Sequence, residues 1–173
     1  QKQKYLPPVC QGQHLASFAF TEPGTGSDPK QIESTARKEG NYFILNGTKR
    51  FISNGSYPGP LVVFARDTEI NSISAFIVDK FCEGYSVSQP WNKICARGSN
   101  LVDIYLQDVK VPEENLLGER GQGFPILLTS IAFGKIGTST CALADTLAAF
   151  EEALNYAKEK LHRGEPIAKF QAI

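Results

Sequence analysis

Two short segments of the sequence combine glycines, hydroxyl groups and aromatic rings in a way that suits a flat, polar ligand. The first, residues 20–28, reads Phe-Thr-Glu-Pro-Gly-Thr-Gly-Ser-Asp. Its two glycines free the backbone to approach a ligand, its hydroxyls can hydrogen-bond to one, and its N–H groups can line an anion or a ring edge. The segment matches neither nucleotide-phosphate loop pattern, so an ordinary turn with an Asx cap is the alternative.

The second segment, residues 46–54, places an aromatic residue two positions before a hydroxyl. Phe51 can stack on a flat ring while Ser53 hydrogen-bonds to its edge. The alternative is a core phenylalanine beside an exposed serine. The sequence carries no Ser–His–Asp, HExxH or paired-carboxylate pattern, so the residues alone predict a ligand site without naming a reaction.

The composition argues against several classes of protein. The 173 residues include 18 Lys+Arg and 18 Asp+Glu, and this neutral balance offers no basic excess for nucleic acid or an anionic membrane. No uncharged apolar run reaches about 18 residues, which predicts no membrane span. The four cysteines lie far apart and only two histidines accompany them, which favours reduced cytosolic thiols over a metal site.

The elements that must position the two segments are short β-rich runs, which continue to about residue 111. Gly, Pro, Asn and Asp separate the runs, and Asn46-Gly47 is one of the turn signals. This spacing predicts a barrel or sandwich rather than alternating βαβ units. The expected strands are Ser17–Phe20, Ser34–Lys38, Tyr42–Lys49, Leu61–Ala65, Ile73–Val78, Tyr85–Ser88 and Leu101–Leu106.

After Gly121 the apolar residues recur at helical spacing. The pattern predicts one helix from near Phe124 to Leu161, about 55 Å long, and Pro166 is expected to open another. No other segment is long enough to cover the apolar stripe. Together with the absence of methionine, this predicts a piece of a longer protein or a chain that assembles. The stripe consists of Leu143, Leu147, Phe150, Leu154, Ala157 and Leu161.

Taken together, these segments resemble the acyl-CoA dehydrogenase family in order and spacing along essentially the whole chain. Residues 20–28 are similar to that family's flavin loop and residues 46–54 to its second flavin segment, with Phe51 and Ser53 in place of the usual Trp and Thr. The resemblance implies an α+β fold. Residues 1–120 would be an antiparallel, barrel- or sandwich-like middle domain, and residues 121–173 the first long helix of an incomplete four-helix bundle. Further similar segments are residues 4–8, 93–99, 111–118, 156–157 and 166–171.

The resemblance also implies an activity and partners. Family members bind FAD and desaturate acyl-CoA thioesters: a carboxylate removes the α-proton while hydride passes from Cβ to flavin N5. Electrons leave through an electron-transferring flavoprotein, and the bundle forms homotetramers or homodimers in the cytoplasm, or in the mitochondrial matrix of a eukaryote. Two alternatives stay open: an acyl-CoA oxidase-like member, and a divergent relative that binds flavin or an acyl carrier without dehydrogenating.

Carried over position by position, the resemblance gives roles to individual residues. Thr21 meets the pyrimidine edge of the flavin, Ser27 lies where flavin and thioester meet, and Lys135 takes the position of a substrate-binding Arg. Lys160 stands for an Arg that reaches the FAD phosphates, and keeps the charge without the bidentate fork. The implied cofactor-binding residues are Phe18, Phe20, Thr21, Gly26, Ser27, Phe51, Ile52, Ser53, Lys160 and Gln171, with Ser27 and Lys135 also binding substrate.

No catalytic residue is assigned within the chain. Some members of the family place the catalytic Glu at the position that Gly134 occupies here, and glycine cannot abstract a proton. Most others carry it beyond the position of Ile173. The base is therefore expected outside these residues, or the protein is one of the non-dehydrogenating relatives.

Overall fold

The structure, a computed structural model, describes residues 1–171 and contains two compact units. The first runs from Gln1 to Leu128, and the second begins at Thr129. The domain boundary predicted at residue 120 stays a prediction. In the structure the first turn of the long helix still belongs to the first unit, because Gly123 lies against the backbone of Ile73 and Ser74 and Leu127 is fully buried.

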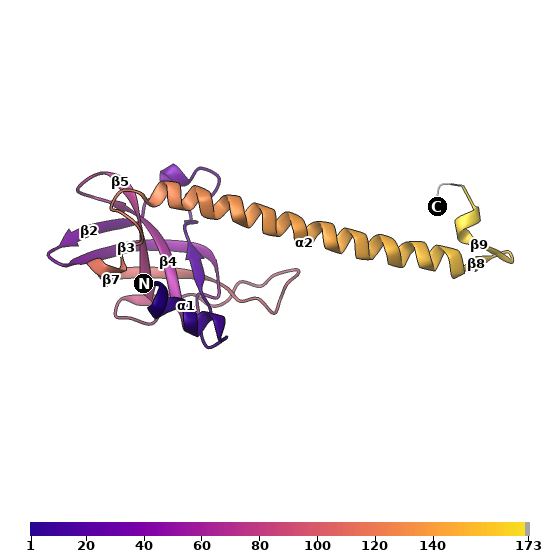
Figure 1. Ribbon diagram of the computed structural model, residues 1–173, viewed down its shortest axis with the longest axis horizontal. Helices are drawn as coiled ribbons and strands as arrows, with labels where there is room; N and C mark the ends of the chain where they lie inside the picture. The colour runs from indigo at the N-terminus through magenta and orange to yellow at the C-terminus, as the bar shows by residue number, and fades with distance from the viewer. Residues whose placement is uncertain (172–173) are drawn as a thin grey trace. The chain divides into compact units, whose positions relative to one another are not determined.

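Seven strands of the first unit form one sheet (Figure 1). The order is β1-β4-β2-β3-β7-β6, and β5 pairs with β4. Each predicted strand is confirmed, although β3, β4, β5 and β7 extend further than expected and β1 ends one residue earlier. The bounds are β1 Ser17–Ala19, β2 Thr35–Glu39, β3 Tyr42–Ser53, β4 Pro60–Asp67, β5 Ser72–Asp79, β6 Tyr85–Val87 and β7 Leu101–Pro112.

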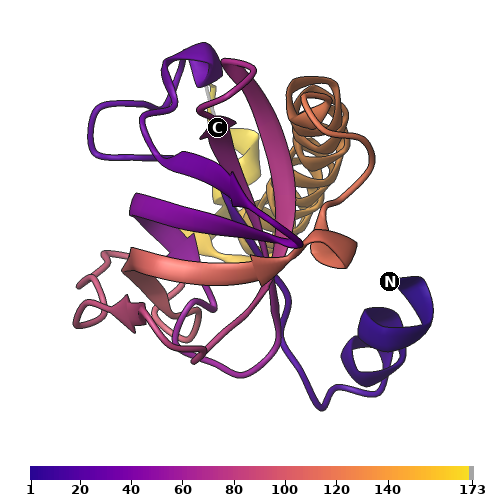
Figure 2. The same cartoon turned by 90° about the vertical axis from the view of Figure 1, so that its left-hand side faces the viewer.

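The α+β class is confirmed, but the sheet of residues 1–128 is mixed and open rather than a wholly antiparallel barrel. Both β1 and β2 run parallel to β4, at residues 61–63 and 66–67 respectively. β5 takes the other edge of β4 along its whole length. Residues 20–34 leave the sheet at the end of β1 and return to start β2 in the same direction, which is why these two pairings are parallel. Figure 2 shows the twist and curvature of the strands.

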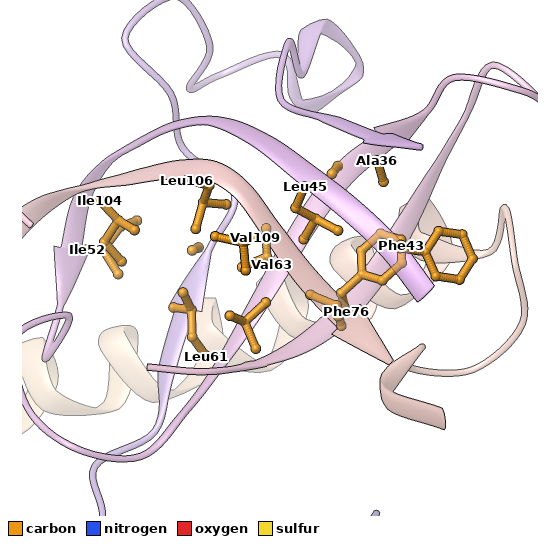
Figure 3. Close-up of a cluster of buried hydrophobic side chains, with 14 of the residues drawn as sticks. Ala36, Phe43, Leu45, Ile52, Leu61, Val63, Phe76, Ile104, Leu106 and Val109 are labelled. Atoms are coloured by element: carbon orange, nitrogen blue, oxygen red, sulfur yellow. The ribbon is translucent and has the colours of Figure 1, made fainter. Parts of the chain in front are cut away.

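The core lies between the inward faces of these strands. Side chains of β3, β4, β5 and β7 point toward one another in Figure 3. Phe43 and Phe76 pack together at one end of the cluster in Figure 3, with their ring centroids 4.9 Å apart. Burial of such apolar surface is the main force that holds the sheet together. Fully or nearly buried members are Leu45, Ile52, Leu61, Val63, Ile104, Leu106 and Val109.

The dipeptide Asn46-Gly47 does not form the predicted turn, because it lies within β3. The β3–β7 register shifts between Leu45 and Gly47, so the pair marks a bulge instead. Gly47 has φ +148, and a Cβ at this position would stand 2.6 Å from the Cβ of Ser34. Glycine is needed here for close approach of two chain segments rather than for a reversal of the chain.

In sequence α1 precedes the sheet and α2 follows it, while η1 lies between β1 and β2. α1 is Lys2–Cys10, and the short 3₁₀ turns η1 and η2 are Pro29–Gln31 and Glu113–Asn115. α2, Gly123–Glu159, confirms the predicted long helix. Most of its apolar side chains are exposed within the described residues, Phe150 by 62% and Leu143 by 60%. By length and composition alone α2 is apolar enough to cross a membrane, a property that core helices of soluble proteins share.

The helix expected to open at Pro166 is not formed. Leu161–His162 (β8) instead pairs with Glu165–Pro166 (β9), and only a 3₁₀ turn, η3 (Ile167–Lys169), follows. The reason is the connection of two residues: Arg163 has φ +51 and Gly164 has φ +83. Two successive left-handed residues make the turn that joins hairpin strands.

Candidate functional site

The structure brings six of the ten predicted cofactor-binding residues to one groove in the first unit. The groove has a volume of about 500 Å³ and lies beside β1, the end of β3 and β4. This volume falls in the range of about 300–1,000 Å³ that is usual for ligand pockets. Its lining comprises the predicted Phe18, Phe20, Thr21, Phe51, Ile52 and Ser53, together with Ala16, Ser17 and Val62.

A bulge near the end of β3 presents Phe51 and Ser53 to the groove. The ladder between β3 and β7 shifts its register between Lys49 and Ile52, so residues 50 and 51 have no ladder partner. Phe51 takes a left-handed conformation with φ +58 and its side chain is 50% exposed, whereas Ile52 is 2% exposed and belongs to the core. Bulges commonly re-aim side chains beside binding sites, and this one turns Phe51 outward.

The two bulged residues use their backbone N–H groups to join separate parts of the chain. The N–H of Arg50 donates to the carbonyl oxygen of Thr21 at 2.8 Å, which attaches the first candidate segment to the second. The N–H of Phe51 donates to Oδ1 of Asp103 on β7 at 3.2 Å. A bulge that would otherwise leave two donors unpaired therefore fixes the groove on both sides.

A buried ion pair holds the first segment from beneath. Nζ of Lys49 lies 2.6 Å from Oε1 of Glu22, and the two side chains are 0% and 2% exposed. Lys49 also donates to the carbonyl oxygens of Phe64 at 2.6 Å and Phe20 at 3.4 Å. The Glu22 carboxylate accepts two backbone N–H groups, from residue 33 at 2.6 Å and residue 34 at 3.0 Å. Every strong donor and acceptor of the pair is thus satisfied.

The environment sets the pKa values of both partners. Burial lowers the pKa of Lys49 to about 8, and the attraction of Glu22 opposes this shift. Burial by itself would raise the pKa of Glu22, but the charge and hydrogen bond of Lys49, together with the hydrogen bonds from residues 33 and 34, lower that pKa below its usual range. The pair is therefore ionic at neutral pH and acts as a support rather than as a proton carrier.

A second buried lysine joins two chain segments next to the groove. Nζ of Lys80 donates to the carbonyl oxygens of Leu15 and Asn54, both at 2.8 Å. It thereby joins the approach to β1 to the exit from β3. Burial lowers the pKa of Lys80 to about 8.

The open face of the groove combines apolar rings with free hydroxyls. The rings of Phe18 and Phe51 are 37% and 50% exposed. The hydroxyls of Thr21 and Ser53 have no hydrogen-bond partner within residues 1–171, so they are available to a ligand. An aromatic face with polar groups at its edge fits a flat heteroaromatic ring such as that of a flavin.

The other predicted residues lie outside this groove. Gly26 and Ser27 are exposed in the loop before η1, and a Cβ at Gly26 would meet no atom within 4 Å. Lys135, Lys160 and Gln171 are exposed in the second unit. The roles given to these five residues stay predictions.

Sequence reasoning assigned no role to the residues that hold the groove together. Glu22 and Lys49 lie inside the candidate segments, but no local pattern indicates that they pair, and none gives a role to Lys80 or Asp103. The available signal was a charged residue within an otherwise apolar run, as at Asp103 in Leu-Val-Asp-Ile, whereas the polar neighbours of Lys49 give no such signal. A charge at such a position is costly unless it is paired, so it points to a buried partner without identifying it.

Comparison with known proteins gives consistent similarities. The family profile described as "Acyl-CoA dehydrogenase, middle domain" matches residues 17–109. The chain is 42% identical to a 3-(aryl)acrylate reductase of Clostridium sporogenes, covering 100% of this chain and 47% of that protein. It is 41% identical to an acyl-CoA dehydrogenase of Bacillus subtilis, covering 100% and 46%. The structure of an acyl-CoA dehydrogenase complexed with FAD from Bacillus anthracis matches with a TM-score of 0.90 and 36% identity, over 98% of this chain and 29% of that one.

Proposed function

This chain belongs to the acyl-CoA dehydrogenase family, and we propose that it supplies the flavin-contacting part of an FAD-dependent oxidoreductase that acts on the Cα–Cβ bond of an acyl-CoA thioester. The single observation that carries the proposal is the groove, where two segments far apart in sequence bring exposed rings and unpaired hydroxyls together. The chain spans about half the length of the curated relatives it matches, so the activity is proposed for the whole protein.

Within the groove each residue has a physical task. Phe51 and Phe18 offer apolar faces against which a flat ring can pack, and Thr21 and Ser53 offer hydroxyls to its polar edge. The bound FAD would accept the hydride that leaves the substrate. Lys49 and Lys80 do not reach the open face, and instead keep the groove in shape before any ligand arrives.

The remaining contacts belong to the same proposal. Gly26 and Ser27 would bring backbone and a hydroxyl to the junction of flavin and thioester, and Lys135 would carry positive charge toward the substrate. Lys160 and Gln171, in the second unit, would meet the FAD phosphates and adjoining groups in an assembled protein. The catalytic carboxylate is expected outside the chain, since Gly134 has no side chain to serve as a base.

Partners and location are part of the same proposal. An electron-transferring flavoprotein would take up the electrons, and a homotetramer or homodimer would cover the exposed apolar face of α2. The proposed location is the cytoplasm, or the mitochondrial matrix of a eukaryote. The charges of Lys135 and Asp145, within the apolar part of α2, support a bundle helix over a membrane span.

One observation favours a second direction of the same chemistry. The relative from Clostridium sporogenes, at 42% identity, is named a reductase. A protein with the same groove would then deliver hydride to an α,β-unsaturated acyl group instead of removing it. Both directions use the same flavin-contacting residues, so the choice depends on the substrate and on the redox partner.

The test is an anaerobic titration of the FAD-loaded protein. A series of saturated acyl-CoA thioesters should bleach the visible flavin absorbance, and in the reductase direction an enoyl- or aryl-acrylyl thioester should restore the colour of the chemically reduced protein. Peroxide release in air, without an electron-transfer partner, would identify the oxidase-like alternative. A protein that binds no FAD, or whose flavin responds to none of these thioesters, would refute the proposal.

Phe51→Leu tests the groove itself. Loss of the aromatic face should weaken FAD binding about tenfold, the factor that corresponds to the loss of one good ring contact. Phe81→Leu is the matched control, because Phe81 is also exposed and left-handed, with φ +64, but lies outside the groove. Equal weakening by the two substitutions would contradict the assignment of the groove.

A further inference from the structure

One buried carboxylate on β7 accepts hydrogen bonds from Phe51, which lines the groove, and from two neighbouring residues. Oδ1 of Asp103 accepts from the N–H of Phe51 at 3.2 Å and from the indole Nε1–H of Trp91 at 3.0 Å. Oδ2 accepts from Nε of Arg50 at 3.2 Å. The Asp103 side chain is only 6% exposed, so these three donors replace the water that the charge gives up on burial.

The position of Asp103 follows from the β3 bulge. The ladder between β3 and β7 skips residues 50 and 51, and Asp103 lies opposite that gap. Phe51 therefore has no ladder acceptor for its N–H, and its left-handed conformation is unfavourable for a residue with a Cβ. The carboxylate supplies the missing acceptor and stabilises the conformation that turns the Phe51 ring outward.

The same carboxylate brings Trp91 to Phe51. The two ring centroids lie 5.2 Å apart with an interplanar angle of 59°, and the Arg50 guanidinium lies 5.8 Å and 5.9 Å from the two rings. The segment that carries Trp91 is tied to β7 by backbone bonds, including Trp91 N–H to the carbonyl oxygen of Leu101 at 2.8 Å. Trp91 is 43% exposed and Phe51 is 50% exposed. The two rings therefore lie at the surface, while the Asp103 carboxylate that binds both residues is buried.

We propose that Asp103 is a positioning residue that holds Phe51 and Trp91 as one aromatic wall of the groove, and that this wall, rather than Phe51 alone, receives the flat ring of the ligand. The identity of that ring as a flavin rests on the proposed function. The wall itself rests only on the contacts of Asp103. Trp91 is not among the residues that line the groove. In this proposal it contacts the ligand beside Phe51.

The test substitutes Asp103 and measures Trp91 directly. Asp103→Ala should shift the Trp91 emission to longer wavelength and increase its quenching by acrylamide in the FAD-free protein. The contribution of Trp91 to the emission is obtained by subtracting the spectrum of the Trp91→Phe variant made in the same background, with or without Asp103→Ala. FAD should bind about tenfold more weakly to Asp103→Ala, as expected for the loss of one hydrogen bond to a charged group. Asp103→Asn, which keeps acceptors for Phe51 and Trp91, should restore most of both signals.

The matched control is Asp108→Ala. Asp108 lies on the same strand, is exposed, and faces the other bulge, where it pairs with Asn46 at 2.9 Å. It should change neither the Trp91 emission nor FAD binding. A double-mutant cycle adds a readout that a purely structural role would not produce. In a Phe51→Leu/Trp91→Leu background, Asp103→Ala should have little further effect on FAD binding.

The outcomes separate the two proposals. A wild-type protein that binds no FAD, while Asp103→Ala still exposes Trp91, would refute the proposed function and support the wall. Unchanged Trp91 emission in Asp103→Ala would overturn the wall. The wall would also be overturned if Asp103→Ala weakened FAD binding in the background without the two aromatic rings as much as it does in the wild-type protein. This conclusion does not depend on the flavin assignment.

Discussion

Replacing Lys49 with methionine should destabilise the first unit strongly, because it leaves Glu22 buried without its counter-charge. The Lys49 side chain is fully buried and its Nζ lies 2.6 Å from the Glu22 carboxylate and 2.6 Å from the carbonyl oxygen of Phe64. Removal of one partner of such a pair typically costs about 3–5 kcal/mol. Two backbone N–H groups still reach Glu22, so we expect about 3 kcal/mol, a large part of a typical stability of about 5–15 kcal/mol.

The assay is urea unfolding, with the free energy of unfolding as the measured quantity. Lys38→Met is the control, since Lys38 also lies 2.6 Å from a carboxylate, that of Glu113, but the pair is on the surface. It should cost less than about 1 kcal/mol. The double variant Glu22→Gln/Lys49→Met should recover part of the loss because no unpaired charge remains. Equal losses in Lys49→Met and Lys38→Met would refute the reasoning.

Two further predictions concern the same unit. Gly47→Ala should lower the melting temperature more than Gly40→Ala does. Both glycines have positive φ, and the space around Gly40 is open. A Cβ at Gly47, by contrast, would lie 2.2 Å from Oγ of Ser34 and overlap it. An equal decrease in melting temperature for the two variants would contradict this prediction, because it would show that backbone strain alone causes the destabilisation. The free energy of unfolding should also decline as the pH falls below about 4.5. The pKa values of Glu22 and Asp67 are lower in the folded protein than in the unfolded chain. At acidic pH the unfolded chain therefore binds more protons than the folded protein, which favours unfolding. Urea unfolding between neutral and acidic pH checks this, and the decline should be smaller in Glu22→Gln/Lys49→Met.

The strands and the long helix could be predicted because their signals are local. Alternating β-branched and aromatic residues, and apolar residues at helical spacing, describe each element by itself. The pairing of the strands could not be derived in this way. The loop of residues 20–34 makes β1 and β2 parallel to β4, and nothing in its composition specifies the direction in which the chain returns.

The candidate site was predictable in its lining but not in its support. Strict alternation along β3 from Phe43 and Leu45 would place Lys49 and Phe51 both inward. The structure keeps Lys49 inward, but the register shift before Ile52 reverses the alternation and turns Phe51 outward. A bulge depends on the opposite strand, here on Asp103, which is about 50 positions away in the sequence. Local patterns therefore indicate which residues lie at the groove but not which residues orient them.

The pair of Phe51 and Trp91 gives the departure at position 51 a physical reason. The family resemblance places a tryptophan there, and a phenylalanine by itself would offer a ligand less aromatic surface. In this structure the Trp91 ring lies 5.2 Å from that of Phe51, and one carboxylate holds both. A larger ring at position 51 would have to share that space with Trp91. The smaller residue therefore fits the proposed wall, in which the aromatic area is divided between Phe51 at the β3 bulge and Trp91 beside β7.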